Sequence, residues 1–188
     1  MTRKRVLWAN AHCLLDTSSG AALSVLTMLH QLVARGWQVE VIGATHFDAP
    51  AGTSRLRQSW PLIERASEAI VEIDDGWLTH QLVRTASLDA AEMRPREARC
   101  LFDRFRQRLL AFHPTVVLQY GNDVVDLLIT QEAKREGAKT ACYLANASYT
   151  RDERFGRDVD VMLTNSRASA SLYQTALGRS VTPLGPFV

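Results

Sequence analysis

The chain has 188 residues, of which 46% are hydrophobic and 22% charged, as expected for a globular protein that can bury a core of its own. Its net charge of +2 excludes the basic excess that is typical of nucleic-acid-binding proteins, so we expect no nucleic-acid partner. Cys13, Cys100 and Cys142 are scattered and form no C-x-x-C pair or metal-spaced cluster, so we expect reduced thiols and no metal site.

The amino terminus, MTRKRVLWANAHCLLD, starts with basic residues and continues with apolar ones, as a signal peptide does. Asn10 and His12 interrupt the apolar run, Asp16 ends it, and no small-residue cleavage site follows. No apolar run approaches the ~20 residues that a membrane-spanning helix needs. We therefore expect a cytoplasmic location, with the inner membrane surface as an alternative position.

A strand–helix–strand unit opens the chain. The apolar run Arg5–Asn10 precedes a turn and is typical of a buried strand. Ser18 or Ser19 can cap the helix that follows, which ends near Ala34–Gly36 with a glycine at its carboxyl end. Trp37–Gly43 then alternates apolar and polar residues and predicts a second strand. The whole unit has the length that a right-handed crossover requires.

The middle of the chain is less regular. Residues 44–66 contain prolines and a glycine and predict no long element. The strand-like segments Glu68–Asp74 and Trp77–Arg84 flank Asp75–Gly76, which is a hairpin turn signal. A helix with an apolar stripe is predicted over Pro95–Phe112, because proline suits the first turn of a helix.

Strands and helices then alternate again. The predicted segments are the strand Thr115–Tyr120, the helix Asp123–Gly137, the strands Ala138–Asn146 and Val159–Ser166, the helix Arg167–Gly178 and a short strand within Ser180–Val188. This alternation predicts a Rossmann-like α/β fold, doubly wound, with a mainly parallel sheet and helices on both faces. We expect one domain over residues 1–183 and the start of a linker at 184–188.

Ligands of such sheets bind outside the carboxyl ends of the strands, near the point where the strand order reverses. Polar segments follow four of the predicted strands: Asn10–Gly20, Tyr120–Asp123, Asn146–Tyr149 and Asn165–Arg167. Asparagine and serine offer uncharged donors and acceptors, which suit sugar hydroxyls. The alternative for each of these residues is that it caps a helix or a turn.

The loop after the first strand lacks the signatures of dinucleotide and P-loop sites. Only Gly20 of a G-x-G-x-x-G pattern is present, and the second strand ends at Gly43–Thr45 without an acidic residue. We therefore expect no NAD or FAD cofactor. The backbone of Ser18–Ala22 can still accept an anion, because amide groups at a helix amino terminus point outward with a positive dipole. The alternative is a capped helix with a glycine for close packing.

Four segments resemble the N-terminal domain of GT-B-fold glycosyltransferases, the large retaining group often called group 1. They are SSGAALSVLTMLHQLVARGWQVEVIG (Ser18–Gly43), IDDGWLTHQLVR (Ile73–Arg84), FHPTVVLQYGN (Phe112–Asn122), and VDVMLTNSRASASLYQTALG (Val159–Gly178) with VTPLGPFV at the carboxyl end. They are similar to the family's glycine-rich loop and helix, its hairpin, its fourth-strand segment and the segment that leads into the second domain. No motif is specific alone; their order and spacing carry the resemblance.

The resemblance implies a transferase built from two Rossmann-like domains that face each other across a cleft. The N-terminal domain mainly binds the acceptor, and the C-terminal domain mainly binds the nucleotide-sugar donor. The donor diphosphate then approaches Ser19, Gly20 and Ala21. The family is usually independent of metals, so the resemblance implies a transferase that needs no metal ion. The resemblance also implies a sugar or lipid-linked acceptor and a C-terminal donor domain as partners.

The chain departs from the family in two respects. It lacks the donor domain with its paired glutamates, so we expect no sugar transfer by this chain alone. Many relatives also carry a histidine just after the fourth-strand segment, where this chain has Tyr120, Asn122 and Asp123. The alternatives are a non-catalytic Rossmann-like ligand-binding module and one subunit of a split transferase. The catalytic residues stay unassigned.

The remaining candidates for the cleft are polar residues in loops after strands. They are His12, Tyr120, Asn122, Asp123, Asn146, Ser148, Asn165, Ser166 and Arg167. His46 follows the second strand and is a further candidate for the edge of the cleft. The arginines of residues 94–108 suggest contact with anionic lipid, but interleaved acidic residues favour a solvated face.

Overall fold

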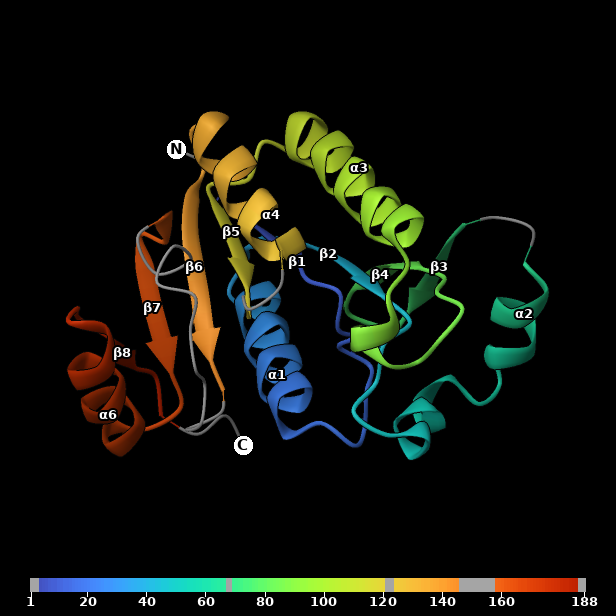
Figure 1. Cartoon of the computed structure of the whole chain (residues 1–188), viewed down its shortest axis with the longest axis horizontal. Helices are drawn as coiled ribbons and strands as arrows, with labels where there is room; N and C mark the ends of the chain where they lie inside the picture. Colours follow the sequence, from blue (N-terminus) through green and yellow to red (C-terminus); the bar gives the residue numbers. More distant parts are fainter. Residues whose placement is uncertain (1–3, 67–68, 121–123, 146–157, 186–188) are drawn as a thin grey trace.

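A single sheet runs through the molecule in the order β3-β4-β2-β1-β5-β6-β7-β8 (Figure 1). We analyse a computed structural model that describes residues 4–66, 69–120, 124–145 and 158–185. Its strands are β1 (Arg5–Ala9), β2 (Gln38–Ala44), β3 (Ile70–Asp74), β4 (Thr79–Val83), β5 (Val116–Gln119), β6 (Lys139–Leu144), β7 (Val161–Thr164) and β8 (Thr182–Pro183). Every neighbouring pair is parallel except the β3–β4 hairpin. The predicted doubly wound, mainly parallel sheet is confirmed.

Helices cover both faces of the sheet. They are α1 (Gly20–Ala34), α2 (Trp60–Arg65), α3 (Pro95–Phe112), α4 (Val124–Arg135) and α6 (Arg167–Leu177). Figure 1 shows α3 and α4 side by side over the central strands, with α2 at one end of the sheet and α6 at the other. Short 3₁₀ segments span Pro50–Leu56 (η1) and Ala90–Glu92 (η2).

Three apolar clusters hold these layers together in the described residues, and alternation along β1 explains the two that lie next to it. Trp8 belongs to the cluster under α1 with Val25 and Leu29, whereas Leu7 belongs to the cluster under α3 with Phe105. Successive side chains of a strand point to opposite faces, so one buried strand supplies both clusters. Each of these side chains is at most 1% exposed.

The predicted elements agree with the structure to within about two residues at most of their ends. The main difference lies in residues 44–66, where we expected no long element and the structure has η1 and the short α2. Both are short helices, of seven and six residues, that begin at or next to a proline, and neither is long enough to show helical periodicity. Within the described ranges, no helix is both long and apolar enough to cross a membrane.

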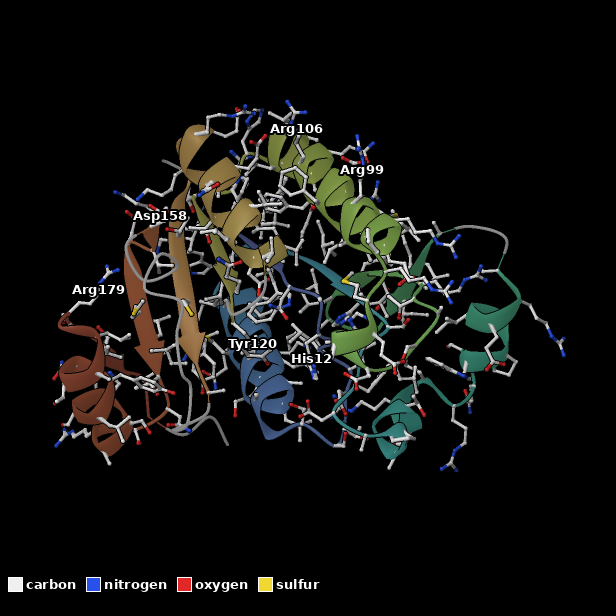
Figure 2. The ribbon with its side chains drawn as sticks, in the orientation of Figure 1. His12, Arg99, Arg106, Tyr120, Asp158 and Arg179 are labelled. Atoms are coloured by element: carbon white, nitrogen blue, oxygen red, sulfur yellow. The ribbon has the colours of Figure 1, made fainter. Side chains whose placement is uncertain are left out.

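The arginine-rich helix α3 carries its charges in ion pairs with neighbouring elements. Arg106 lies 2.9 Å from Glu132 of α4, and Arg108 lies 2.5 Å from Glu40 of β2. Figure 2 shows Arg99 and Arg106 on the outer side of this helix. These pairs favour the interpretation of a solvated, internally paired face over a lipid-binding one.

Candidate functional site

The strand order reverses between β1 and β5. From β1 the chain crosses to β2 on one side, and it returns later through α3 to β5 on the other side. Ligands of open α/β sheets bind at such a switch point, outside the carboxyl ends of the strands. The loop after β1 carries His12, and the end of β5 is followed by Tyr120. Figure 2 shows these two side chains next to each other near the middle of the molecule.

Asn10 fixes the start of the loop after β1. Its side-chain amide donates to a carboxylate oxygen of the buried Asp126 at 3.0 Å, and its side-chain oxygen accepts from the backbone amide of His12 at 2.9 Å. Asp126 lies in the first turn of α4. The backbone position of His12 is therefore set by a helix that is distant in sequence.

The imidazole of His12 lies between two carboxylates. Its Nε2 is 3.2 Å from an oxygen of Asp16, and its Nδ1 is 3.7 Å from an oxygen of Asp48. The Asp16 side chain is fully buried, whereas that of Asp48 is 57% exposed. Nδ1 is therefore the ring nitrogen on the more accessible side, and Asp16 faces the buried Nε2, which has no hydrogen-bond partner among the described residues.

Asp16 is a structural anchor of this loop. Its carboxylate accepts hydrogen bonds from the backbone amide of Ser18 at 2.7 Å, the hydroxyl of Ser18 at 2.5 Å and the backbone amide of Asp48 at 2.7 Å. Burial alone would raise the pKa of Asp16, but these hydrogen bonds and the nearby His12 outweigh burial and lower it below its ordinary value. Asp16 therefore stays ionised and ties the β1 loop to the loop after β2.

Gly52 of η1 packs directly against Asp16. The backbone amide of Thr17 donates to the carbonyl of Gly52 at 3.1 Å. A Cβ atom added at Gly52 would lie 2.0 Å from the Asp16 carboxylate oxygen that Ser18 holds. No residue other than glycine fits here without displacing that carboxylate.

The amino terminus of α1 follows this loop. Ser19 caps the helix by accepting from the amide of Ala22 at 3.3 Å, as the capping alternative predicts. The amides of Gly20 and Ala21 have no partner among the described residues, and the first turn of α1 carries no acidic side chain. A Cβ added at Gly20 would meet no atom within 4 Å, so the explanation of a glycine for close packing is wrong. These two amides are a site that can accept an anion.

Tyr120 forms the wall beside His12. Its ring packs edge-on against Trp8 at 4.7 Å and against the His12 ring at 6.1 Å between centroids. Its hydroxyl is buried without a hydrogen-bond partner in the part of the chain that the structure describes. Burial, followed by the neighbouring Tyr143 and the two carboxylates of the loops, raises the pKa of Tyr120 well above its ordinary value. The phenol is therefore neutral and has a donor to offer.

The donor set of His12, Asp16 and Asp48 has the right types for a divalent cation, and one ligand atom of each lies within 4.8 Å of the others. Asp16, however, already accepts three hydrogen bonds from neutral donors. A metal ion would have to compete with these donors. The geometry therefore fits an ion-paired loop better than a metal centre.

The polar residues before α6 are used for capping. Ser166 caps the helix by accepting from the amide of Ser169 at 3.0 Å, and Asn165 accepts from the Ser169 hydroxyl at 3.2 Å. Arg167 is exposed. β7 lies three strands from β1, which corresponds to about 14 Å at the usual strand spacing. The structure therefore does not bring this segment into contact with His12.

Four of the predicted site residues, Asn122, Asp123, Asn146 and Ser148, lie outside the described residues. The expectation for His46 is wrong, because this side chain is 0% exposed and does not line a cleft. Burial is the main cause that lowers the pKa of His46, so its ring stays neutral. The sequence analysis assigned no role to Asp48, which has no local signal, or to Asp16, whose position two residues before Ser18 is a turn signal.

Solved structures of the same architecture include two longer proteins. MurG from Acinetobacter baumannii matches with a TM-score of 0.51 at 14% identity, over 88% of this chain and 42% of its own. UDP-GlcNAc 2-epimerase from Methanocaldococcus jannaschii matches with a TM-score of 0.55 at 10% identity, over 97% of this chain and 45% of its own. The chain thus spans less than half the length of either protein. No family model and no curated protein matches the sequence. The chain has the Rossmann-like fold found in one half of GT-B proteins.

Proposed function

We propose that this chain is the acceptor-side domain of a glycosyltransferase of the hexosyltransferase type. The complete enzyme transfers a sugar from a nucleotide-sugar to a sugar or lipid-linked acceptor, without a metal ion or another cofactor. A C-terminal donor domain completes the cleft, and the chain alone does not transfer sugar. A lipid-linked acceptor would bring the domain to the inner membrane surface.

The observation that carries this proposal is the free amino terminus of α1 at the switch point of the sheet. The amides of Gly20 and Ala21 are without partners, and no acidic side chain in the first turn of the helix opposes the dipole. Phosphate oxygens are the ligands that such amides bind best. We therefore assign the donor diphosphate to Ser19, Gly20 and Ala21.

His12 is our candidate for the acceptor contact. Asp16 faces its Nε2, which leaves Nδ1 on the accessible side of the ring. Nδ1 can exchange a hydrogen bond with a sugar hydroxyl, which both donates and accepts. The unpartnered hydroxyl of Tyr120 lies beside it as a donor.

The proposal is tested by titrating the full chain with UDP-N-acetylglucosamine and following its backbone amides by NMR. We expect weak, millimolar binding, with the largest shifts at Gly20 and Ala21, since most donor contacts belong to the other domain. A Gly20→Asp variant separates a phosphate site from an ordinary helix cap. A carboxylate there complements the helix dipole and stabilises the fold by up to about 1 kcal/mol, but it repels phosphate. We expect a more stable protein that no longer binds.

Gly20→Ala is the matched control, because a methyl group at this position meets open space and carries no charge. It should bind as the unchanged chain does. If Gly20→Asp binds the nucleotide-sugar as well as Gly20→Ala, the diphosphate does not lie at this helix and the proposal fails. Tight binding by the chain alone would instead favour the alternative of a non-catalytic ligand-binding module.

A further inference from the structure

A pocket of about 410 Å³ lies between α1, η1 and the turn of the β3–β4 hairpin, apart from the candidate site. Leu15, Leu56 and Ile73 form its apolar lining, and its polar lining comes from His30, Arg55 and Asp74. Trp77 is part of the same wall. His12, Gly20 and Tyr120 of the candidate site do not line it. Its size and its mixture of apolar and polar groups are those of a small-molecule site.

Asp75 makes the wall of this pocket rigid. One of its carboxylate oxygens accepts from Nε2 of His30 at 2.8 Å and from Nε2 of the buried His80 at 3.0 Å. The other oxygen accepts from the backbone amides of Trp77 and Leu78, both at 2.8 Å. A single carboxylate thus fixes the hairpin turn against α1. Because both of its oxygens accept, the Nε2 of His30 carries the proton, and Nδ1 is left as the acceptor of that ring.

Trp77 is the exposed aromatic group of the pocket. Its side chain is 56% exposed, although it is the largest kind of apolar side chain. Its ring stacks on the His30 ring at 5.6 Å with an interplanar angle of 25°. The indole therefore rests on a fixed support and presents a flat apolar surface to solvent. Such a surface binds flat apolar faces of ligands through area burial and dispersion.

The charges around the pocket decide which kind of ligand fits. Arg55 is its cation, and Asp74 is its exposed carboxylate. The negative charge of Asp75 is already satisfied by two imidazoles and two amides. With Asp75 engaged in this way, Arg55 faces one accessible carboxylate, so the pocket has no strong preference for an ion. The groups left for a ligand are the guanidinium of Arg55, the oxygen of Asp74 that does not accept from the Gly76 amide, and Nδ1 of His30.

We propose that this pocket binds a neutral saccharide unit, with one face of the sugar ring against Trp77. A pyranose ring has an apolar face of C–H groups and a rim of hydroxyls, which matches a tryptophan surface beside a guanidinium and a carboxylate. The site lies apart from the candidate site at the switch point. It gives the domain a second place to hold a carbohydrate, in addition to the proposed acceptor contact at His12.

The test is an NMR titration of the full chain with glucose, N-acetylglucosamine and trehalose, followed at the indole N–H signal of Trp77 and at the backbone amides of Ile73, Asp74 and Asp75, which also report in variants without the indole. We expect saturable, millimolar binding of at least one of these sugars. Replacement of the aromatic ring should weaken that binding by about fivefold or more in Trp77→Ala, as expected for the loss of about 1 kcal/mol of stacking. Arg55→Ala should also weaken it, whereas Arg57→Ala, a nearby exposed arginine outside the pocket lining, should not.

Two results would overturn the proposal. We expect a dissociation constant of about 1 mM for a weak site. In the first result, no sugar shifts the Trp77 signal even at a concentration about 50-fold above that constant. In the other, uridine or adenosine binds at Trp77 more tightly than any of the sugars, which would make the pocket a nucleobase site. Trp77→Leu, which keeps an apolar side chain, replaces Trp77→Ala if the latter does not fold. Because Gly20→Asp leaves this pocket intact, failure at one site is distinguishable from failure at the other.

Discussion

The amino termini of α1 and α6 make an instructive pair. Both follow a parallel strand, both begin after serines, and the sequence analysis treated both as candidate ligand sites. At each helix one serine caps a single amide, and the first two amides have no partner among the described residues. The two termini differ in their surroundings: the side chains of Asn165, Ser166 and Ser169 are bonded to one another at α6, whereas α1 follows β1 at the switch point of the strand order. Free amides therefore indicate a site only where the topology also places them at the switch point.

The largest effect is expected at Asp16, the anchor that the α6 terminus lacks. Asp16→Ala removes a buried carboxylate together with its charge-assisted hydrogen bonds to the part-buried amides of Ser18 and Asp48, and the free energy of unfolding should fall by about 3 kcal/mol. Urea denaturation measures this loss. Ser166→Ala is the matched control at α6. If Asp16→Ala and Ser166→Ala lower the free energy of unfolding equally, Asp16 is no stronger an anchor for α1 than an ordinary helix cap is for α6.

The same carboxylate predicts a pH dependence. Because the pKa of Asp16 is lowered by folding, its contribution is complete above the ordinary carboxyl pKa and is lost as the pH falls from there through the lower folded value. Urea denaturation between pH 7 and pH 3 should therefore show a smaller loss of stability in Asp16→Ala than in the unchanged chain. If the free energy of unfolding falls equally with pH in both proteins, folding does not lower the pKa of Asp16.

A somewhat smaller effect is expected at Gly52. Gly52→Ala places a methyl group against the Asp16 carboxylate, which three hydrogen bonds hold in place, and should destabilise the fold by about 2 kcal/mol. Chemical denaturation and the NMR signal of the His12 ring report stability and loop geometry separately. Gly20→Ala, which meets no atom, is the control and should be close to neutral. An unchanged Gly52→Ala variant would mean that the two loops are not packed as described.

Ser166→Ala should cost about 1 kcal/mol, the usual value of a helix cap, and should leave the affinity for UDP-N-acetylglucosamine unchanged. Urea denaturation measures the free energy of unfolding, and the NMR titration measures the affinity for the nucleotide-sugar. If Ser166→Ala loses nucleotide-sugar binding without losing stability, the ligand binds at α6 and not at α1.

The smallest effect is expected from metal ions. Asp16 is saturated by hydrogen-bond donors, so millimolar Mn²⁺ or Mg²⁺ should not shift the unfolding midpoint of the chain. Thermal unfolding with and without each ion checks this. A clear shift that disappears in His12→Gln would show that His12, Asp16 and Asp48 do hold a cation.

Much of the fold follows from local pattern in the sequence. The strand–helix alternation, the serine before α1 and the proline that opens α3 each act on their own neighbours, so their consequences are readable from the residues. The location of the site at the carboxyl ends of the strands follows from topology in the same way. His12 and Tyr120 were both predicted there and are neighbours in the structure.

The rest depends on contacts between residues far apart in the sequence. Asn10 with Asp126, Asp16 with Asp48, and Asp75 with His30 are pairs that no spacing rule connects. His46 was misjudged because its position after a strand does not reveal that its backbone pairs with the loop after β1 and that its side chain is buried. Whether Ser166 is free or used as a cap also depends on side-chain rotamers, which sequence pattern does not encode.

The two edges of the sheet also restrict how the domain associates. At one edge β8 is only two residues long and includes Pro183, which has no amide hydrogen to donate. At the other edge β3 runs antiparallel and carries Glu72 and Asp74, charged side chains of the kind that discourage pairing with a further strand. Both edges are therefore poor templates for strand addition. We expect the domain to resist edge-to-edge aggregation and to meet other proteins through its loops and faces.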